Sequence, residues 1–186
     1  SGSVNNGVGA EYAYDPADNR AYVGVGGANP ASPATVAGGS FESPGTTSYV
    51  YRPTASYAGA SGLAANNSAW HFNSAPDGNQ VAFLQTGSAA ASVSLQVTGL
   101  SPGKAYAASF FLSARPGYHG NPVTVALNDL PLGTFDPPTA TFTPATTAAF
   151  TAPAGSAILT FTGIAATYDM ATAIDKVTVT AVAQQP

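Results

Sequence analysis

Residues 91–114 read ASVSLQVTGLSPGKAYAASFFLSA and decide the fold class of this chain. Apolar and polar residues alternate over residues 93–97, and the alternation resumes over residues 106–112 after the turn-forming segment 101–104. A period of two residues is the pattern of a β-strand with one buried face. The stretch therefore predicts two antiparallel strands joined as a β-hairpin.

The same alternation recurs along the rest of the chain. It continues through residues 123–127 to the turn-like pair Asn128-Asp129 and a short strand at 132–135, with later strands expected around 150–179. Twenty glycines and 15 prolines interrupt the chain, and no apolar period of 3.6 residues persists. We expect an all-β sandwich or barrel with less than about a tenth of its residues in helix.

Composition narrows the class of protein. The chain has 186 residues, 45% of them hydrophobic, which suits one domain core. Only 8% of residues are charged and the net charge is −4, so we expect no nucleic-acid partner and no docking on an anionic membrane. No apolar stretch approaches the roughly 18 residues of a membrane span. Without cysteine, the chain can form neither disulfides nor thiolate metal sites.

Two parts of the chain differ in composition. Residues 1–38 are rich in Gly, Asn, Ala and Pro, so we expect a linker-like segment with one possible strand at residues 11–16. Residues 39–186 hold the alternating pattern and are expected to form the sandwich. Few Lys and Arg residues among many Ala, Thr, Ser and Gly are typical of exported bacterial proteins, which predicts a secreted protein.

A set of segments between residues 40 and 179 resembles the bacterial carbohydrate-binding modules of the galactose-binding-like jelly-roll type. The segments are Ser40-Phe41-Glu42-Ser43-Pro44, Tyr49-Val50-Tyr51-Arg52-Pro53, Gly62-Leu63-Ala64-Ala65-Asn66, Ala75-Pro76-Asp77-Gly78-Asn79-Gln80-Val81-Ala82-Phe83-Leu84-Gln85, the stretch 97–104, Ser113-Ala114-Arg115 and Ala173-Ile174-Asp175-Lys176-Val177. In one respect the chain departs from the family. Trp-x-Phe usually follows the Tyr/Pro motif closely, whereas here Trp70-His71-Phe72 comes later.

The resemblance implies a jelly-roll β-sandwich that binds a polysaccharide without acting on it. Such a module would be a monomeric part of a larger protein carrying a glycoside hydrolase or polysaccharide lyase. The alternative is a structural or adhesive module of an exported surface protein, and a third reading is a small hydrolase of unrecognised type.

Motifs for catalysis are weak, which predicts that the chain is not an enzyme. Glycosidases need two carboxyl groups flanking the scissile bond, and the only glutamates are Glu11 and Glu42. Neither His71 nor His119 is paired by a motif with a serine.

Residue alternation suggests a sugar site at the end of the strand 106–115. Tyr106, Phe110 and Leu112 suit the core, which turns Ser109, Phe111, Ser113 and Arg115 to the other face. Arg115 could end a strand in solvent or donate paired hydrogen bonds to hydroxyls or a uronate, and this second role slightly favours an acidic polysaccharide. Trp70 could be a core anchor or a stacking surface. The predicted sugar-binding residues are Tyr51, Trp70, Ser113, Arg115, Tyr118 and His119.

Two acidic residues point to a metal. By alternation Asp175 shares a face with Val177 and would point to the interior, where a carboxylate needs compensation. The resemblance places Glu42 nearby, at an edge where related jelly rolls carry a structural calcium, a cation that prefers oxygen ligands. We predict calcium bound by Glu42 and Asp175, with Asp77 as a rival ligand. The alternative is that backbone N–H groups, or a lysine or arginine, hold each acid without a metal.

Overall fold

A computed structural model describes residues 2–4, 8–14, 21–25, 34–72, 74–166 and 169–182. The chain divides into two compact units, Ser1–Ala31 and Ser32–Pro186. All regular secondary structure in the described residues is β, and none of them forms a helix long and apolar enough to cross a membrane.

The first unit is a small antiparallel sheet of three strands in the order β1-β2-β3. Its strands are β1 (Gly2–Val4), β2 (Val8–Tyr14) and β3 (Ala21–Val25). The sequence predicted one possible strand in residues 1–38, so the structure adds two strands there. β4 (Thr35–Val36) also lies before residue 38, but it pairs with β9 of the second unit.

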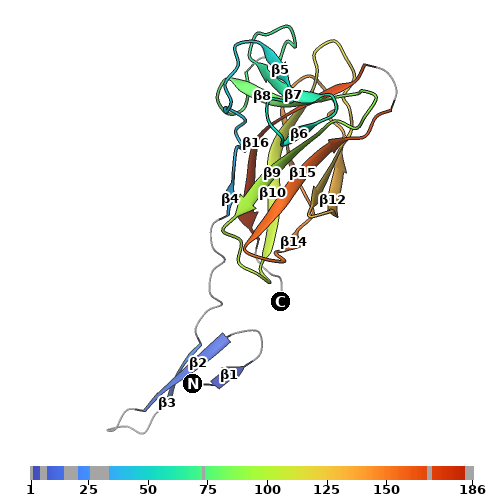
Figure 1. Ribbon diagram of the computed structural model, residues 1–186. Helices are drawn as coiled ribbons and strands as arrows, with labels where there is room; N and C mark the ends of the chain where they lie inside the picture. The colour runs from blue at the N-terminus through green and yellow to red at the C-terminus, as the bar shows by residue number, and fades with distance from the viewer. Residues whose placement is uncertain are drawn as a thin grey trace. The chain divides into compact units, whose positions relative to one another are not determined.

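The second unit is a sandwich of two antiparallel sheets (Figure 1). The seven-stranded sheet runs in the order β13 (Thr143–Thr146), β10 (Ala105–Ala114), β16 (Ala171–Ala181), β8 (Gln80–Gln85), β7 (Ser61–Ala65) and β5 (Tyr49–Tyr51), with β14 (Phe150–Thr151) also paired to β10. The six-stranded sheet runs in the order β12 (Leu130–Phe135), β11 (Val123–Leu127), β15 (Ser156–Gly163), β9 (Ser92–Thr98) and β4, with β6 (Tyr57–Ala58) also paired to β9. The predicted all-β antiparallel sandwich is confirmed.

The hairpin predicted from residues 91–114 is wrong. Both strands exist, but β9 pairs with β15 in one sheet whereas β10 pairs with β16 in the other. Alternation shows that a strand has one buried face, and it does not show which strand lies beside it. By contrast, β11 and β12 do form a hairpin, because Asn128 and Asp129 both take the positive φ angles that a tight two-residue turn requires.

The main core lies between the two sheets. The Phe110 ring of β10 meets Phe161 of β15 and Phe135 of β12 edge to face, with ring centroids 5.0 and 5.1 Å away. Phe110 is 2% exposed and Phe161 is fully buried. These contacts join the sheets, because in each pair the edge of one ring lies against the electron-rich face of the other.

Candidate functional site

One row of residues crosses the outer face of the seven-stranded sheet. The strand register aligns Tyr51, Gly62, Phe83, Ala173 and Ser113 on five successive strands. Directly paired residues in an antiparallel sheet point to the same face, so this row defines one end of the outer face. The five strands are β5, β7, β8, β16 and β10, and β5, β7 and β8 lie at the top of Figure 1.

Residues 66–72 and 74–79 fold over part of this row, so that Phe83, Ala173 and Ser113 are buried whereas Tyr51 stays exposed. Trp70 stacks on Phe83 with ring centroids 3.9 Å apart, and Phe72 stacks at 6.0 Å from Trp70. Trp70 is only 3% exposed and belongs to a second apolar cluster with Val81 and Ala173. Of the two roles considered for Trp70, the structure supports the core anchor, because its ring is buried and does not offer a face to a ligand.

Ser113 lies beneath the same cover. Its side chain is fully buried, and its hydroxyl donates to the Ala114 carbonyl oxygen at 3.0 Å. The sequence placed Ser113 correctly on the outer face of β10. It could not show that another part of the chain covers that face, so the prediction of an exposed, sugar-contacting Ser113 is wrong.

An exposed cluster of tyrosines borders the buried tryptophan. Tyr49 and Tyr51 are 46% and 41% exposed, and each ring centroid lies 6.2 Å from that of Trp70 in an edge-to-face arrangement. Gly62 leaves room for the Phe83 ring beside Tyr51, because a Cβ at residue 62 would lie 2.7 Å from that ring. The missing side chain lets Tyr51 and Phe83 meet across β7 at 5.0 Å.

Arg115 extends this cluster to a third tyrosine. Its guanidinium lies 4.4 Å from the Trp70 ring centroid and 4.1 Å from that of Tyr118, which is 43% exposed. Nη2 donates to the Ala69 carbonyl oxygen at 3.4 Å, while the buried Nε has no hydrogen-bond partner among the described residues. Arg115 thus joins the rings as a stacked plane. We call Tyr49, Tyr51, Trp70, Arg115 and Tyr118 the aromatic platform.

A short polar chain borders the platform beside Tyr51. The Tyr51 hydroxyl donates to Gln85 Oε1 at 2.5 Å, and Gln85 Nε2 donates to Asp169 Oδ1 at 2.7 Å. Burial raises the pKa of Tyr51, and the neighbouring Tyr49 and Asp169 act in the same direction while Arg115 opposes them. Tyr51 therefore remains a protonated donor at neutral pH.

Sequence reasoning missed three residues here: Tyr49, Gln85 and Asp169. Strand alternation gave a usable signal for Tyr49, because residues 49 and 51 share a face. Nothing local could have found the Gln85 to Asp169 contact, which joins residues 84 positions apart.

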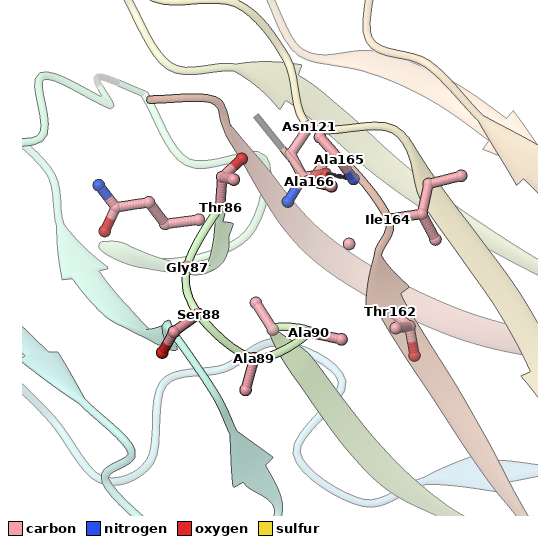
Figure 2. Close-up of a pocket in the computed structure, with 13 residues that line it drawn as sticks. Thr86, Gly87, Ser88, Ala89, Ala90, Asn121, Thr162, Ile164, Ala165 and Ala166 are labelled. Atoms are coloured by element: carbon pink, nitrogen blue, oxygen red, sulfur yellow. Dashed lines mark hydrogen bonds between the residues drawn. The ribbon is translucent and has the colours of Figure 1, made fainter. Parts of the chain in front are cut away.

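Two cavities adjoin the platform, and a third is lined by its polar neighbour Gln85. One of about 480 Å³ is lined by Tyr51, Arg52 and Ser88, and another of about 280 Å³ by Tyr118, His119 and Asp136. The third, of about 510 Å³, is drawn in Figure 2 and lies between the loop at residues 86–91 and residues 162–166, with Asn121 beside Ala165. His119 is exposed, and the structure brings it into the cavity beside Tyr118.

The predicted metal residues are held by backbone N–H groups, three of them from residues 77–80 and one from Lys176. Asn79 and Gln80 donate their N–H groups to Glu42 Oε1 at 3.0 and 2.9 Å. Asp77 and Lys176 donate theirs to the two oxygens of Asp175 at 2.8 and 2.7 Å. The backbone N–H contacts expected from the alternative without a metal are therefore present at both Glu42 and Asp175.

Asp175 is buried, but not for the reason that alternation suggested. It pairs with Phe111, and Thr178 pairs with Ser109, so two residues of β16 between them oppose one residue of β10. This β-bulge reverses the alternation and separates Asp175 from Val177. Asp175 therefore lies on the outer face under residues 76–79, and the prediction that it points into the main core is wrong.

Glu42, Asp77 and Asp175 form an acid cluster, whose excess negative charge suits a cation. Burial raises the pKa of Asp175 to about 7; the N–H donors of Asp77 and Lys176 oppose this rise, and the charges of Asp77 and Glu42 add to it. The Glu42 carboxyl also fits closely over Gly78, where a Cβ would lie 2.3 Å from Glu42 Cδ. The described residues contain no group of three or more His, Cys, Asp or Glu arranged to hold a metal, so backbone oxygens would have to complete any coordination shell.

Comparison with known proteins identifies shared folds without a family. No family model and no curated protein matches the chain. A Stig cyclase from Fischerella sp. TAU, solved with (3Z)-3-(1-methyl-2-pyrrolidinylidene)-3H-indole, is 16% identical with a TM-score of 0.65, covering 84% of this chain and 100% of its own. A cyclase from the same organism, solved with 4-(1H-indol-3-yl)butan-2-one, is 17% identical with a TM-score of 0.64 over 83% and 99%. The carbohydrate-binding module TmCBM61, solved with β-1,4-galactotriose, is 13% identical with a TM-score of 0.50 over 78% and 96%.

These structures confirm the jelly-roll fold and correct one prediction. The sequence predicted a chain that is not an enzyme, and two similar structures are cyclases. The same fold therefore carries catalysis in other proteins, and the weakness of hydrolase motifs in this sequence does not exclude an enzyme.

Proposed function

We propose that this chain binds a polysaccharide through the aromatic platform. The observation that carries the proposal is the row of half-exposed tyrosine rings at one end of the sandwich, held rigid by Trp70 and Arg115. Sugar rings present flat apolar faces with hydroxyls at their edges. Exposed rings bordered by hydrogen-bonding groups, here Gln85 and Asp169, complement both features.

The platform suits the internal part of a glycan chain. Tyr51 and Arg52 line one outer cavity, and Tyr118 and His119 line the other. A surface that continues beyond both outer tyrosines leaves room for a chain that passes across it. We propose that the chain serves as an exported module of a longer protein that acts on polysaccharides.

Binding to polysaccharides by affinity electrophoresis and calorimetry tests this function. β-1,4-Galactan and β-1,4-mannan are suitable first probes, because similar folds occur in a module solved with β-1,4-galactotriose and in a β-(1,4)-mannanase from Podospora anserina with a TM-score of 0.51. We expect Tyr49→Ala, Tyr51→Ala and Tyr118→Ala each to weaken binding about fivefold, from a loss of ~1 kcal/mol per ring.

Leu130→Ala is the matched control, because Leu130 is an exposed apolar residue, 53% accessible, on β12 of the other sheet. It should bind as the parent does. Retention on no polysaccharide in a broad panel would contradict the proposal and favour a structural or adhesive module.

We also propose that calcium binds beside Glu42 and Asp175 as a structural ion. A divalent cation would offset the negative charges of Glu42, Asp77 and Asp175. It would also favour the ionised form of Asp175. Glu42 precedes β5 and Asp175 lies in the last strand, so the ion would tie distant parts of the chain together. Chelation should lower the melting temperature by several degrees, and an identical melting curve with chelator would contradict the metal.

A further inference from the structure

A second groove lies on the outer face of the seven-stranded sheet, outside the aromatic platform. It has a volume of about 210 Å³, and its walls come from β10, β13 and β16. Its lining residues include Ser109, Phe111, Thr146, Lys176 and Thr178. The groove thus combines one aromatic ring, one cation and several hydroxyl groups on a sheet face.

The β-bulge in β16 places the cation there. Lys176 has a φ angle of 52°, a left-handed conformation that costs a non-glycine residue free energy. The extra residue breaks the alternation and brings Lys176 to the same face as Phe111, where Nζ lies 5.9 Å from the ring centroid. A regular strand at this position would alternate Lys176 away from the face that carries Asp175 and Phe111.

Hydroxyl groups from β10, β13 and β16 lie in the same groove as the Phe111 ring. Ser109 and Thr146 hydroxyls lie 3.0 Å apart across β10 and β13, and Thr178 is exposed beside them. Phe111 is partly exposed and Lys176 is exposed, so both are accessible to a ligand. At 5.9 Å the amine is near the outer limit of a cation–π contact, which leaves its charge free to pair with an anion.

We propose that this groove is a second carbohydrate site, selective for a sugar that carries a carboxylate. The sugar ring lies on Phe111, its carboxylate pairs with Lys176, and its hydroxyls bond with Ser109 and Thr146. The whole chain has only five Lys and Arg residues and a net charge of −4, so a lysine on this face provides a local attraction that the chain as a whole does not. This assigns any preference for acidic glycans to Lys176, because the Arg115 guanidinium is enclosed by two rings.

Titration with oligogalacturonate, followed by NMR or calorimetry at low and high salt, tests the second site. Lys176→Asn removes the charge and suits the left-handed backbone, because asparagine tolerates positive φ. We expect about fivefold weaker binding for Lys176→Asn and for Phe111→Ala, and a loss of most of the salt dependence in Lys176→Asn. Lys104→Gln, which removes a lysine from the turn before β10, should bind as the parent does.

Comparison with neutral galactan separates this inference from the proposed function. Loss of oligogalacturonate binding in Lys176→Asn with unchanged galactan binding supports two sites. If Lys176→Asn binds oligogalacturonate like the parent, or if Tyr51→Ala abolishes that binding while Lys176→Asn retains it, the second site is refuted and the platform hypothesis stands. If no variant or parent binds galactan while oligogalacturonate binding depends on Lys176, the platform hypothesis fails alone.

Discussion

The two ends of one sheet face differ in what covers them. At the Ser113 end, Trp70 and Phe72 lie over the strands, and Phe83, Ala173 and Ser113 beneath them are buried. At the Ser109 end, none of the described residues forms such a cover over the groove, and Phe111 remains partly exposed. The same strand, β10, thus contributes a structural surface at one end and an accessible one at the other. The difference comes from a loop and not from the strand's own alternation.

Substitution of Trp70 should show the largest effect of this difference. Trp70→Ala removes a buried ring that stacks on Phe83, so we expect a loss of about 3–5 kcal/mol of stability and a fall in melting temperature of about 10 °C. Phe111→Ala, at the uncovered end, should cost about 1 kcal/mol or less. Equal melting temperatures for the two variants would contradict the assignment of Trp70 as a core anchor.

The sequence predicted much of this fold and less of its site, for reasons visible at particular residues. Alternation found β9, β10 and β11 because each buries one face, a local property of the chain. It misassigned Ser113 and the direction of Asp175, since burial of Ser113 depends on a loop some 40 residues away and the face of Asp175 depends on a bulge. The platform brings together Tyr51, Gln85 and Asp169, and no sequence spacing encodes that proximity.

The covered acid cluster should respond to pH and to calcium together. Asp175 has a pKa of about 7 in the folded chain and 3.8 as its ordinary value, so between these pH values the folded state holds a proton that the unfolded state has lost. Stability of the metal-free protein should therefore fall as pH rises from about 4 to about 7 and then stay level. Thermal melting in chelator across this range measures the effect.

Asp175→Asn is the matched variant for that experiment. It should lose the dependence between about pH 4 and pH 7 that Asp175 causes, and calcium should no longer raise its melting temperature. In the parent, calcium should stabilise more at pH 8 than at pH 5, because protons compete for the carboxylate. A parent whose melting temperature rises steadily through this pH window without metal would contradict a raised pKa at Asp175.

Oligosaccharide length should sharpen the contrast between the extended platform and the compact groove. Affinity for neutral β-1,4-linked oligomers should rise with each added sugar until the platform is filled, whereas oligogalacturonate affinity at the groove should level off sooner. Arg52→Ala and His119→Ala, at the two outer cavities, should weaken binding about twofold for long neutral oligomers and leave a disaccharide unaffected. Affinity independent of length would show that the site takes a chain end.

The smallest effect should come from exchanging the cation within the platform. Arg115→Lys keeps the charge but replaces a planar group lying 4.4 and 4.1 Å from two ring centroids, so about 1 kcal/mol of stacking should be lost. Tyr118 would then be held less firmly, and neutral galactan binding should weaken about twofold. Lys104→Arg is the control, because Lys104 lies in the turn before β10 and makes no cation–π contact among those described. Since Lys176 is proposed to bind the carboxylate, oligogalacturonate binding should change no more than galactan binding does. A selective loss of oligogalacturonate binding in Arg115→Lys would mean that the covered end of the sheet, and not the uncovered groove, binds the acidic sugar.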